Sequence, residues 1–256
     1  MWRIRLDTAA NRLALEVRDP DLLLAHFYTF GISGRSLKPL PLQQAWWQGL
    51  EDAQDGYIYL HGYGDRKMGQ HKGIIAVEAG TGAVAWEEQE LALYGIAENA
   101  VLAYMAVAPE AAFLSLQPGT GQQMRESVTQ QRAAEMVAEF SLLRSRQAIY
   151  PVLYREGEEY FAEVQQFLNS LQITGATLAI EYAETEAAFV ASYYERCADG
   201  TLQNYIAVFD KEGSFCLKER LASGLSGIGS DTFFIFRDDL YFVKDHAILE
   251  VYRLIV

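Results

Sequence analysis

A thirteen-residue segment occurs twice in this chain, and its repetition constrains the fold more than any other feature of the sequence. Residues 75–87 return as residues 114–126 without a gap, at a spacing of 39 (121 minus 82). Glycine, threonine and glutamate keep their places, as Gly80, Thr81, Gly82 and Glu87 in the first copy and as Gly119, Thr120, Gly121 and Glu126 in the second. Self-similarity with a period of about 40 residues is typical of propellers and solenoids, which stack one small unit many times.

Two looser copies extend the pattern. From Ile4 to Glu16, apolar and acidic residues precede their matches by 71 positions, and Asn11 stands where the first copy has Gly82. After glycine, asparagine is the residue that best tolerates a positive φ in a tight turn. The fourth copy runs from Ile206 to Glu219. Each copy alternates apolar residues with period two before its turn, which predicts a β-hairpin with one buried face.

The segments between these hairpins are rich in aromatic and branched aliphatic residues, which predicts further short strands. The expected fold is all-β: one β-propeller of PQQ- or WD40-like blades over residues 1–256. About six blades fit, with five or seven left open. We expect closure by pairing of an N-terminal strand, residues 2–6 or 12–17, with the C-terminal strand at residues 248–254. Helical spacing also predicts one or two inserted helices, over residues 158–171 and, more weakly, 130–143.

The segment from Gly73 to Trp86 resembles the blade signature of quinoprotein (PQQ-like) β-propellers, with an apolar strand, an acid, a Thr-Gly turn and a final tryptophan. The whole chain also resembles an uncharacterised bacterial family, a domain of unknown function, through residues 13–19, 45–50, 59–63, 192–194 and 231–235. This resemblance implies a propeller and no known activity. Quinoprotein dehydrogenases hold their quinone with a vicinal disulfide and a calcium site, whereas Cys197 and Cys216 are nineteen residues apart. We therefore expect neither PQQ nor another cofactor.

The composition limits the partners and the location of the protein. Its formal net charge is −13, and an acidic surface repels phosphate groups, so neither nucleic acid nor an anionic membrane is an expected partner. No apolar run is long enough to span a bilayer. The N-terminus lacks the basic segment and apolar core of a signal peptide. With two isolated cysteines, these features predict a cytoplasmic protein.

The sequence contains no P-loop, His-Glu-x-x-His, Cys-x-x-Cys or Gly-x-Ser-x-Gly motif, so no catalytic residue is assigned. The candidate ligand-binding residues are His61, Tyr63, Asp65 and His71, in a polar stretch that is predicted to be a loop. Converging His61, His71 and Asp65 would form a divalent-cation site or an acid–base pair. The alternative is a solvated loop with a hydrogen-bonded histidine.

Trp46 and Trp47 are the other candidates for ligand binding. Adjacent residues of a strand face opposite sides, so one tryptophan is expected in the core and the other at the surface. The exposed ring would stack on a sugar or a partner, or both rings would fill a gap between blades. Arg18 and Asp19, after the first hairpin, are interpreted as a charge pair.

These observations favour a non-catalytic binding or scaffold protein that holds a protein or small-molecule ligand at one rim or at the channel mouth. The alternative is a small-molecule hydrolase or lyase with a metal or His/carboxylate site there. A structural subunit that docks through its helices is the third hypothesis.

Overall fold

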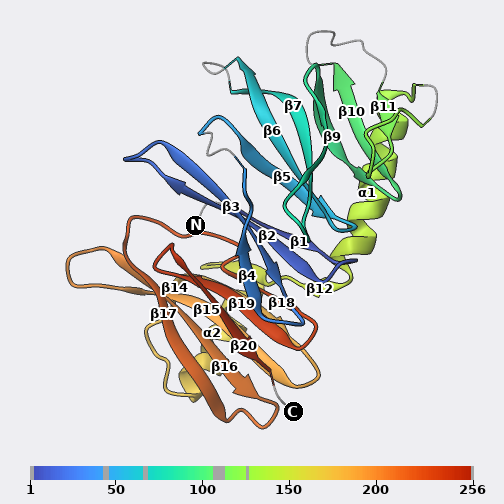
Figure 1. Cartoon of the computed structure of the whole chain (residues 1–256). Helices are drawn as coiled ribbons and strands as arrows, with labels where there is room; N and C mark the ends of the chain where they lie inside the picture. The colour runs from blue at the N-terminus through green and yellow to red at the C-terminus, as the bar shows by residue number, and fades with distance from the viewer. Residues whose placement is uncertain (1–2, 43–45, 66–68, 106–112, 125–126, 255–256) are drawn as a thin grey trace. The chain divides into compact units, whose positions relative to one another are not determined.

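The computed structural model describes residues 3–42, 46–65, 69–105, 113–124 and 127–254, without the side chain of Asp65. The chain forms two compact units, residues 1–144 and 145–256. Most of the described secondary structure is antiparallel β-sheet, as Figure 1 shows, and this confirms the mostly β composition that was expected.

In the described part of the first unit, three sheets follow one another, and in each the strands pair in sequence order. The first sheet is formed by β1 (Arg3–Asp7), β2 (Arg12–Asp19), β3 (Leu24–Gly31) and β4 (Ser36–Pro39). The second sheet is formed by β5 (Gly49–Gln54), β6 (Tyr57–Asp65), β7 (Gln70–Glu78) and β8 (Val84–Glu88). The third sheet is formed by β9 (Leu91–Ala97), β10 (Ala100–Met105) and β11 (Leu114–Leu116).

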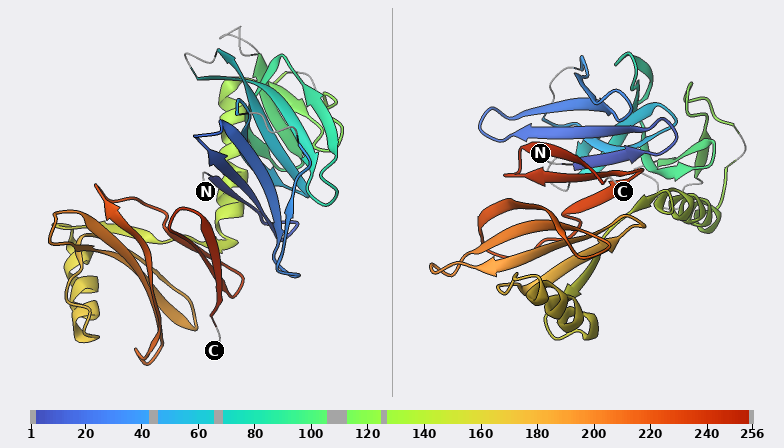
Figure 2. Two further views of the ribbon diagram at one scale, coloured as in Figure 1. Left: turned by 60° about the vertical axis from the view of Figure 1, so that its left-hand side comes forward. Right: turned by 90° about the horizontal axis from the view of Figure 1, so that it is seen from below.

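Neighbouring sheets of the first unit pack face to face through apolar side chains. Leu60 of β6 joins Phe27 in the cluster between the first and second sheets. The adjacent residue of β6, Tyr59, joins Val101 in the cluster between the second and third sheets. Successive residues of a strand point to opposite faces, so β6 contributes to two cores. Helix α1 (Gln130–Ser145) covers the third sheet through Ala133 (Figures 1 and 2).

The turns confirm the equivalence of the repeated segments. Asn11, Gly82 and Gly121 all adopt positive φ, at 52°, 78° and 67°. In both copies a threonine hydroxyl donates to the side chain three residues earlier, from Thr81 to Glu78 over 2.7 Å and from Thr120 to Gln117 over 2.9 Å. The recurrent acid or amide and the threonine therefore stabilise the turn itself.

The second unit contains two sheets among its described residues. The larger sheet is formed by β13 (Val152–Arg155), β14 (Thr177–Glu184), β15 (Ala188–Arg196), β16 (Leu202–Asp210) and β17 (Phe215–Leu225). The smaller sheet has the order β12 (Ala148–Ile149), β18 (Phe233–Phe236), β19 (Asp239–Lys244) and β20 (Ile248–Arg253). Helix α2 (Glu159–Ser170) packs Phe161 and Leu168 against the larger sheet (Figure 2). Both expected helices are thus present, and neither is long and apolar enough to cross a bilayer.

The observed strand pairing excludes one of the two N-terminal segments that were expected to pair with the C-terminal strand. β2 lies between β1 and β3, so residues 12–17 cannot also pair with the C-terminal strand. β1 pairs with β2, and β20 pairs with β19. Pairing of residues 2–6 with the C-terminal strand stays a prediction, as do the single domain over residues 1–256 and the number of blades.

Two local predictions are wrong. The stretch from His61 to Lys72 is mostly strand, because β6 extends to Asp65 and β7 begins at Gln70. Glycines at 62 and 64 interrupt the apolar alternation, yet at Gly62 the missing side chain is a packing requirement, since a Cβ there would lie 2.9 Å from a backbone oxygen of β7. Trp46 and Trp47 lie in a turn that precedes β5 rather than in a strand.

Candidate functional site

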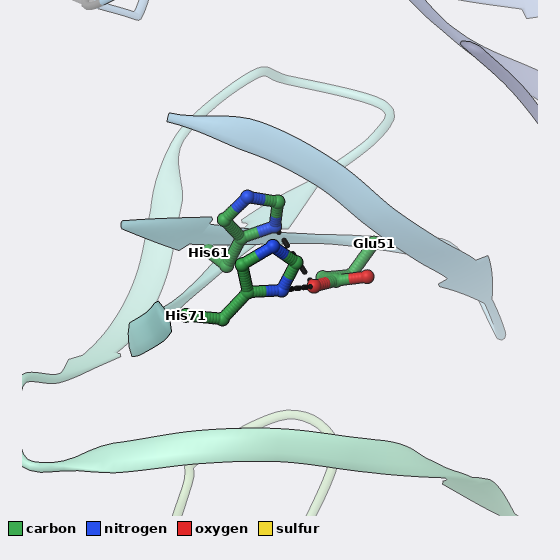
Figure 3. Close-up of side chains that lie close together, drawn as sticks. All are labelled: Glu51, His61 and His71. Atoms are coloured by element: carbon green, nitrogen blue, oxygen red, sulfur yellow. Dashed lines mark ion pairs between the residues drawn. The ribbon is translucent and has the colours of Figure 1, made fainter. Parts of the chain in front are cut away.

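Three adjacent strands of the second sheet bring Glu51, His61 and His71 together (Figure 3). The Glu51 Oε1 atom lies 2.9 Å from His61 Nδ1 and 2.5 Å from His71 Nδ1. The two imidazole rings are stacked, with centroids 3.6 Å apart and planes 10° from parallel. One donor atom from each of the three side chains lies within 4.8 Å of the others. A carboxylate and two imidazoles thus converge on one point.

Two irregularities in strand pairing create this convergence. Leu50 pairs with Leu60 and Asp52 pairs with Tyr59, so Glu51 is an extra residue in β5. An unbroken ladder from the hairpin turn would pair Glu51 with Leu60, on the face opposite to His61. β-bulges often redirect a side chain toward a site. The extra residue therefore turns Glu51 toward the histidines.

The second irregularity lies between β6 and β7. His61 pairs with Ile74 and Gly62 pairs with Lys72, which leaves Gly73 as the extra residue, with φ at 88°. Tyr63 is then directly opposite His71. Residues opposite each other share a face of the sheet, so this bulge sets His71 beside His61 and Tyr63.

His61 is the buried member of the cluster, with 2% of its surface exposed. Neither ring nitrogen has a hydrogen-bond partner of standard geometry among the described residues, although Nδ1 is close to Glu51. A buried polar atom without a partner is costly and calls for an explanation in each case. Gly49 makes room for the ring, because a Cβ at that position would lie 2.5 Å from His61 Cε1.

The charges of the cluster suit metal ligands. Burial acts to raise the pKa of the Glu51 carboxyl, but the adjacent imidazoles and Arg3, 3.6 Å away, hold that pKa below its ordinary value. Burial and the neighbouring His61 ring lower the pKa of His71, against the opposite effect of Glu51. An ionised carboxylate and a neutral imidazole are the forms that bind metal ions.

Aromatic rings border the cluster on one side. The Tyr63 ring meets both imidazoles edge-on, with centroids 5.0 Å from His61 and 5.4 Å from His71. Trp47 meets Tyr63 edge-on at 6.0 Å, and 41% of its surface is exposed. Trp46 is half-buried, and its ring lies against the Arg18 guanidinium at 4.9 Å. Trp47 is thus the more exposed of the two, as predicted, but Trp46 is half-buried rather than in the core, and both lie in a turn.

The sequence identified His61, Tyr63 and His71 and missed Glu51. The backbone of Asp65 ends β6 opposite Gln70, while its side chain lies outside the described residues. The Asp55-Gly56 pair signals a two-residue hairpin turn that brings β5 beside β6, but the regular register of that turn places Glu51 on the face opposite to His61, so the pair does not identify Glu51. Both residues have the positive φ that such a turn requires, 53° and 82°.

Comparison with known proteins gives a family-model match to part of the chain and remote similarity to solved structures. A family model described as Domain of unknown function (DUF4905) matches residues 6–86, which are 81 of the 256 residues and include the whole cluster. The comparison with curated proteins gives no match.

Three solved structures are similar over nearly the whole chain. The β-propeller domain of the Trilobed protease from Pyrococcus furiosus is 10% identical, with 99% of this chain and 81% of that chain covered and a TM-score of 0.36. A eukaryotic initiation factor is 8% identical, with coverage of 98% and 85% and a TM-score of 0.27. An oligogalacturonate lyase in complex with manganese is 10% identical, with coverage of 99% and 74% and a TM-score of 0.27. At these scores none of the three assigns a function to this chain.

Proposed function

We propose that this protein binds a divalent transition-metal ion through Glu51, His61 and His71. The observation that carries the proposal is the convergence of two imidazoles and one carboxylate from three paired strands, with both nitrogens of buried His61 lacking a well-aligned hydrogen bond. Imidazole ligands suit zinc, iron, nickel and copper, whereas calcium and magnesium prefer sites made only of oxygen. The expected ion is therefore one of the first-row transition metals.

The present spacing of the donor atoms indicates how the site would accommodate an ion. Donors around a tetrahedral ion at about 2.1 Å are roughly 3.4 Å apart, whereas Glu51 Oε1 lies 2.9 and 2.5 Å from the histidine nitrogens. The planes of the two stacked imidazole rings are also nearly parallel, 10° apart. Metal binding would therefore require Glu51 to withdraw by less than about 1 Å and His71 to tilt. The His71 side chain is 38% exposed, whereas His61 is buried and would serve as the fixed ligand.

Three protein ligands leave one or more coordination positions for water or for an organic ligand. Tyr63 lies beside the two imidazoles and Trp47 lies beside Tyr63, so aromatic surface continues outward from the proposed site. The arrangement supports the prediction of a binding protein. The metal ion would be bound first and would hold part of the ligand. We also propose that the successive antiparallel sheets are blades of a β-propeller and that the protein is cytoplasmic.

A cobalt titration of tag-free protein tests the proposal. Co²⁺ bound by imidazole and carboxylate gives visible absorption bands, and zinc should displace it. His61→Ala, His71→Ala and Glu51→Gln should each weaken binding at least tenfold, while His246→Ala serves as the control because it removes an exposed histidine of the second unit. Equal affinity in all four variants would refute the proposed site. At one hundred times its dissociation constant, the metal should also stabilise the protein by about 2.7 kcal/mol.

A metal-independent acid–base site is the second candidate. The observation that favours it is the 2.5 Å distance between Glu51 Oε1 and His71 Nδ1 on a partly exposed imidazole. A carboxylate in that position orients a histidine and stabilises its protonated form. A hydrolase or lyase activity that survives chelator treatment and is lost in His71→Ala would support this candidate over the metal site.

A further inference from the structure

A buried ion pair lies beside the cluster, on the neighbouring sheet. Glu16 and Arg18 are two residues apart on β2, so they share a face, and their side chains are 0% and 11% exposed. The Arg18 Nε atom donates to Glu16 Oε1. Asp19 accepts hydrogen bonds from the backbone of residues 21 and 22, and a charge pair between Arg18 and Asp19 stays a prediction.

This ion pair holds the backbone that leads into β5. Arg18 Nη1 donates to the carbonyl oxygen of Trp46 over 2.9 Å, and Nη2 donates to that of Gln48 over 2.7 Å. Glu16 Oε2 accepts a hydrogen bond of 2.8 Å from the backbone N–H of Leu50. Three alternate residues before Glu51 are thus fixed by two side chains of another strand.

The same pair borders the space next to His61. A Cβ at Gly49 would lie 2.7 Å from His61 Nε2 and 3.4 Å from Arg18 Nη2. The backbone at Gly49 is therefore packed against both the guanidinium and the imidazole. Because Gly49 pairs with His61 and Glu51 follows two residues later, the position of this segment sets the distance between two of the three proposed ligands.

We propose that Glu16 and Arg18 are positioning residues of the metal site, an inference that rests on the proposed function. Buried ion pairs are weak evidence for a contribution to stability, since well-packed apolar residues often replace them without loss. Groups that orient metal ligands, in contrast, typically change metal affinity by 10–100-fold when they are removed. Glu16 and Arg18 make their contacts to the segment that leads into β5, the strand that carries Glu51. These contacts favour a role in positioning the metal ligands over a role in stability.

The test compares cobalt binding in Arg18→Met and in the double variant Glu16→Gln/Arg18→Met with that of the wild-type protein. The double variant removes both charges and so leaves no unpaired buried ion. Asp7→Asn is the matched control, because Asp7 is a buried β1 carboxylate that accepts hydrogen bonds from the backbone of Asp55 and Gly56, at the far end of the same hairpin.

We expect at least tenfold weaker Co²⁺ binding and an altered visible spectrum in both Arg18 variants, with Asp7→Asn within about twofold of the wild type. Arg18→Lys, which keeps the charge but cannot donate to both carbonyl oxygens in the same way, should be intermediate, and it replaces Arg18→Met if that variant does not fold. Cobalt affinity and spectrum unchanged in folded Arg18 variants would overturn the inference.

NMR of the imidazole groups in the protein without added metal tests the positioning role of Glu16 and Arg18 separately from metal binding. If the wild-type protein binds no cobalt, the metal proposal fails, while ¹H–¹⁵N correlations of His61 and His71 still report their contact with Glu51. Shifted imidazole signals in Arg18→Met, but not in Asp7→Asn, would support positioning of the cluster without metal. Unchanged signals would overturn the positioning role as well.

Discussion

Gly49→Ala should damage the cluster more than the size of a methyl group suggests. The added Cβ would lie 2.5 Å from His61 Cε1 and 2.7 Å from His61 Nε2. Carbon atoms in contact are about 3.5 Å apart, so the ring must move by about 1 Å. Stacking on His71 at 3.6 Å and the edge contact with Tyr63 restrict that movement. The backbone of Gly49 is not left-handed and accepts alanine, so the cost comes from the contact with His61.

Overpacking of this kind costs about 1–3 kcal/mol, and the lower entropy of the unfolded alanine chain offsets about 0.4–1 kcal/mol. The net loss in the free energy of unfolding should be about 1.3 kcal/mol, the difference between the midpoints of these two ranges. Metal ligands must be placed to within about 0.2 Å, so the proposed Co²⁺ affinity should fall at least tenfold.

Urea unfolding followed by tryptophan fluorescence measures the stability. All four tryptophans fall at positions 2, 46, 47 and 86, within the first unit, so their emission reports that unit. Gly31→Ala is the control, since its Cβ would have no neighbour closer than 3.9 Å. In a His61→Ala background the cost of Gly49→Ala should largely disappear, because the two side chains would no longer collide. An equal cost in both backgrounds would refute the steric argument.

Two further predictions concern buried charges. Burial raises the pKa of the Glu181 carboxyl, against the hydrogen bonds that it accepts from Thr232 and Asp231. The folded state therefore binds this proton more tightly than the unfolded state, and the stabilisation present below the ordinary pKa of glutamate is lost as pH rises through the folded pKa. Relative to Glu181→Gln, the wild-type protein should therefore lose stability as pH rises above the ordinary glutamate pKa of about 4.3, as measured by circular dichroism in urea. A pH-independent difference would contradict this. Arg144→Met should destabilise the first unit by about 2 kcal/mol, because it removes charge-assisted hydrogen bonds to Asp52 at 2.8 and 2.7 Å. Urea unfolding followed by tryptophan fluorescence measures this loss, and a urea midpoint equal to that of the wild-type protein would contradict it.

The sequence predicted those parts of the structure whose causes are local. Positive φ at Asn11 and Gly82 followed from turn chemistry, and α2 followed from apolar spacing, since the helix begins at Glu159 and ends at Ser170. The polar stretch after His61 was misread because polar strand residues next to glycine do not differ in composition from a loop. Turn residues and apolar alternation therefore predicted the hairpins better than they predicted where each strand ends.

The candidate site was less predictable because it depends on strand register. His61 and His71 were recognisable as candidates by their chemistry, but the extra residue at Glu51 has no sequence signature. Without that bulge, the Asp55-Gly56 turn would direct Glu51 to the other face of the sheet. Register is set by packing across two sheets, and a single chain sequence does not display that packing.

The repeat also explains why its glycines cannot be replaced by asparagine in every copy. A Cβ at Gly82 would lie 2.4 Å from Pro41 Cδ, and a Cβ at Gly121 would lie 2.7 Å from Trp86 Cδ2. In each case a residue that follows or belongs to the last strand of one sheet packs on the turn of the next sheet. Trp86 also donates a hydrogen bond of 2.7 Å from Nε1 to the carbonyl oxygen of Pro118 in that turn. Positive φ alone would permit asparagine, as at Asn11, whereas close approach permits only glycine. The glycines of the repeat are therefore required by a contact between neighbouring sheets as well as by the hairpin turn. The contact of Trp86 with the turn at Gly121 also holds the second sheet, which carries the cluster of Glu51, His61 and His71, against the third sheet.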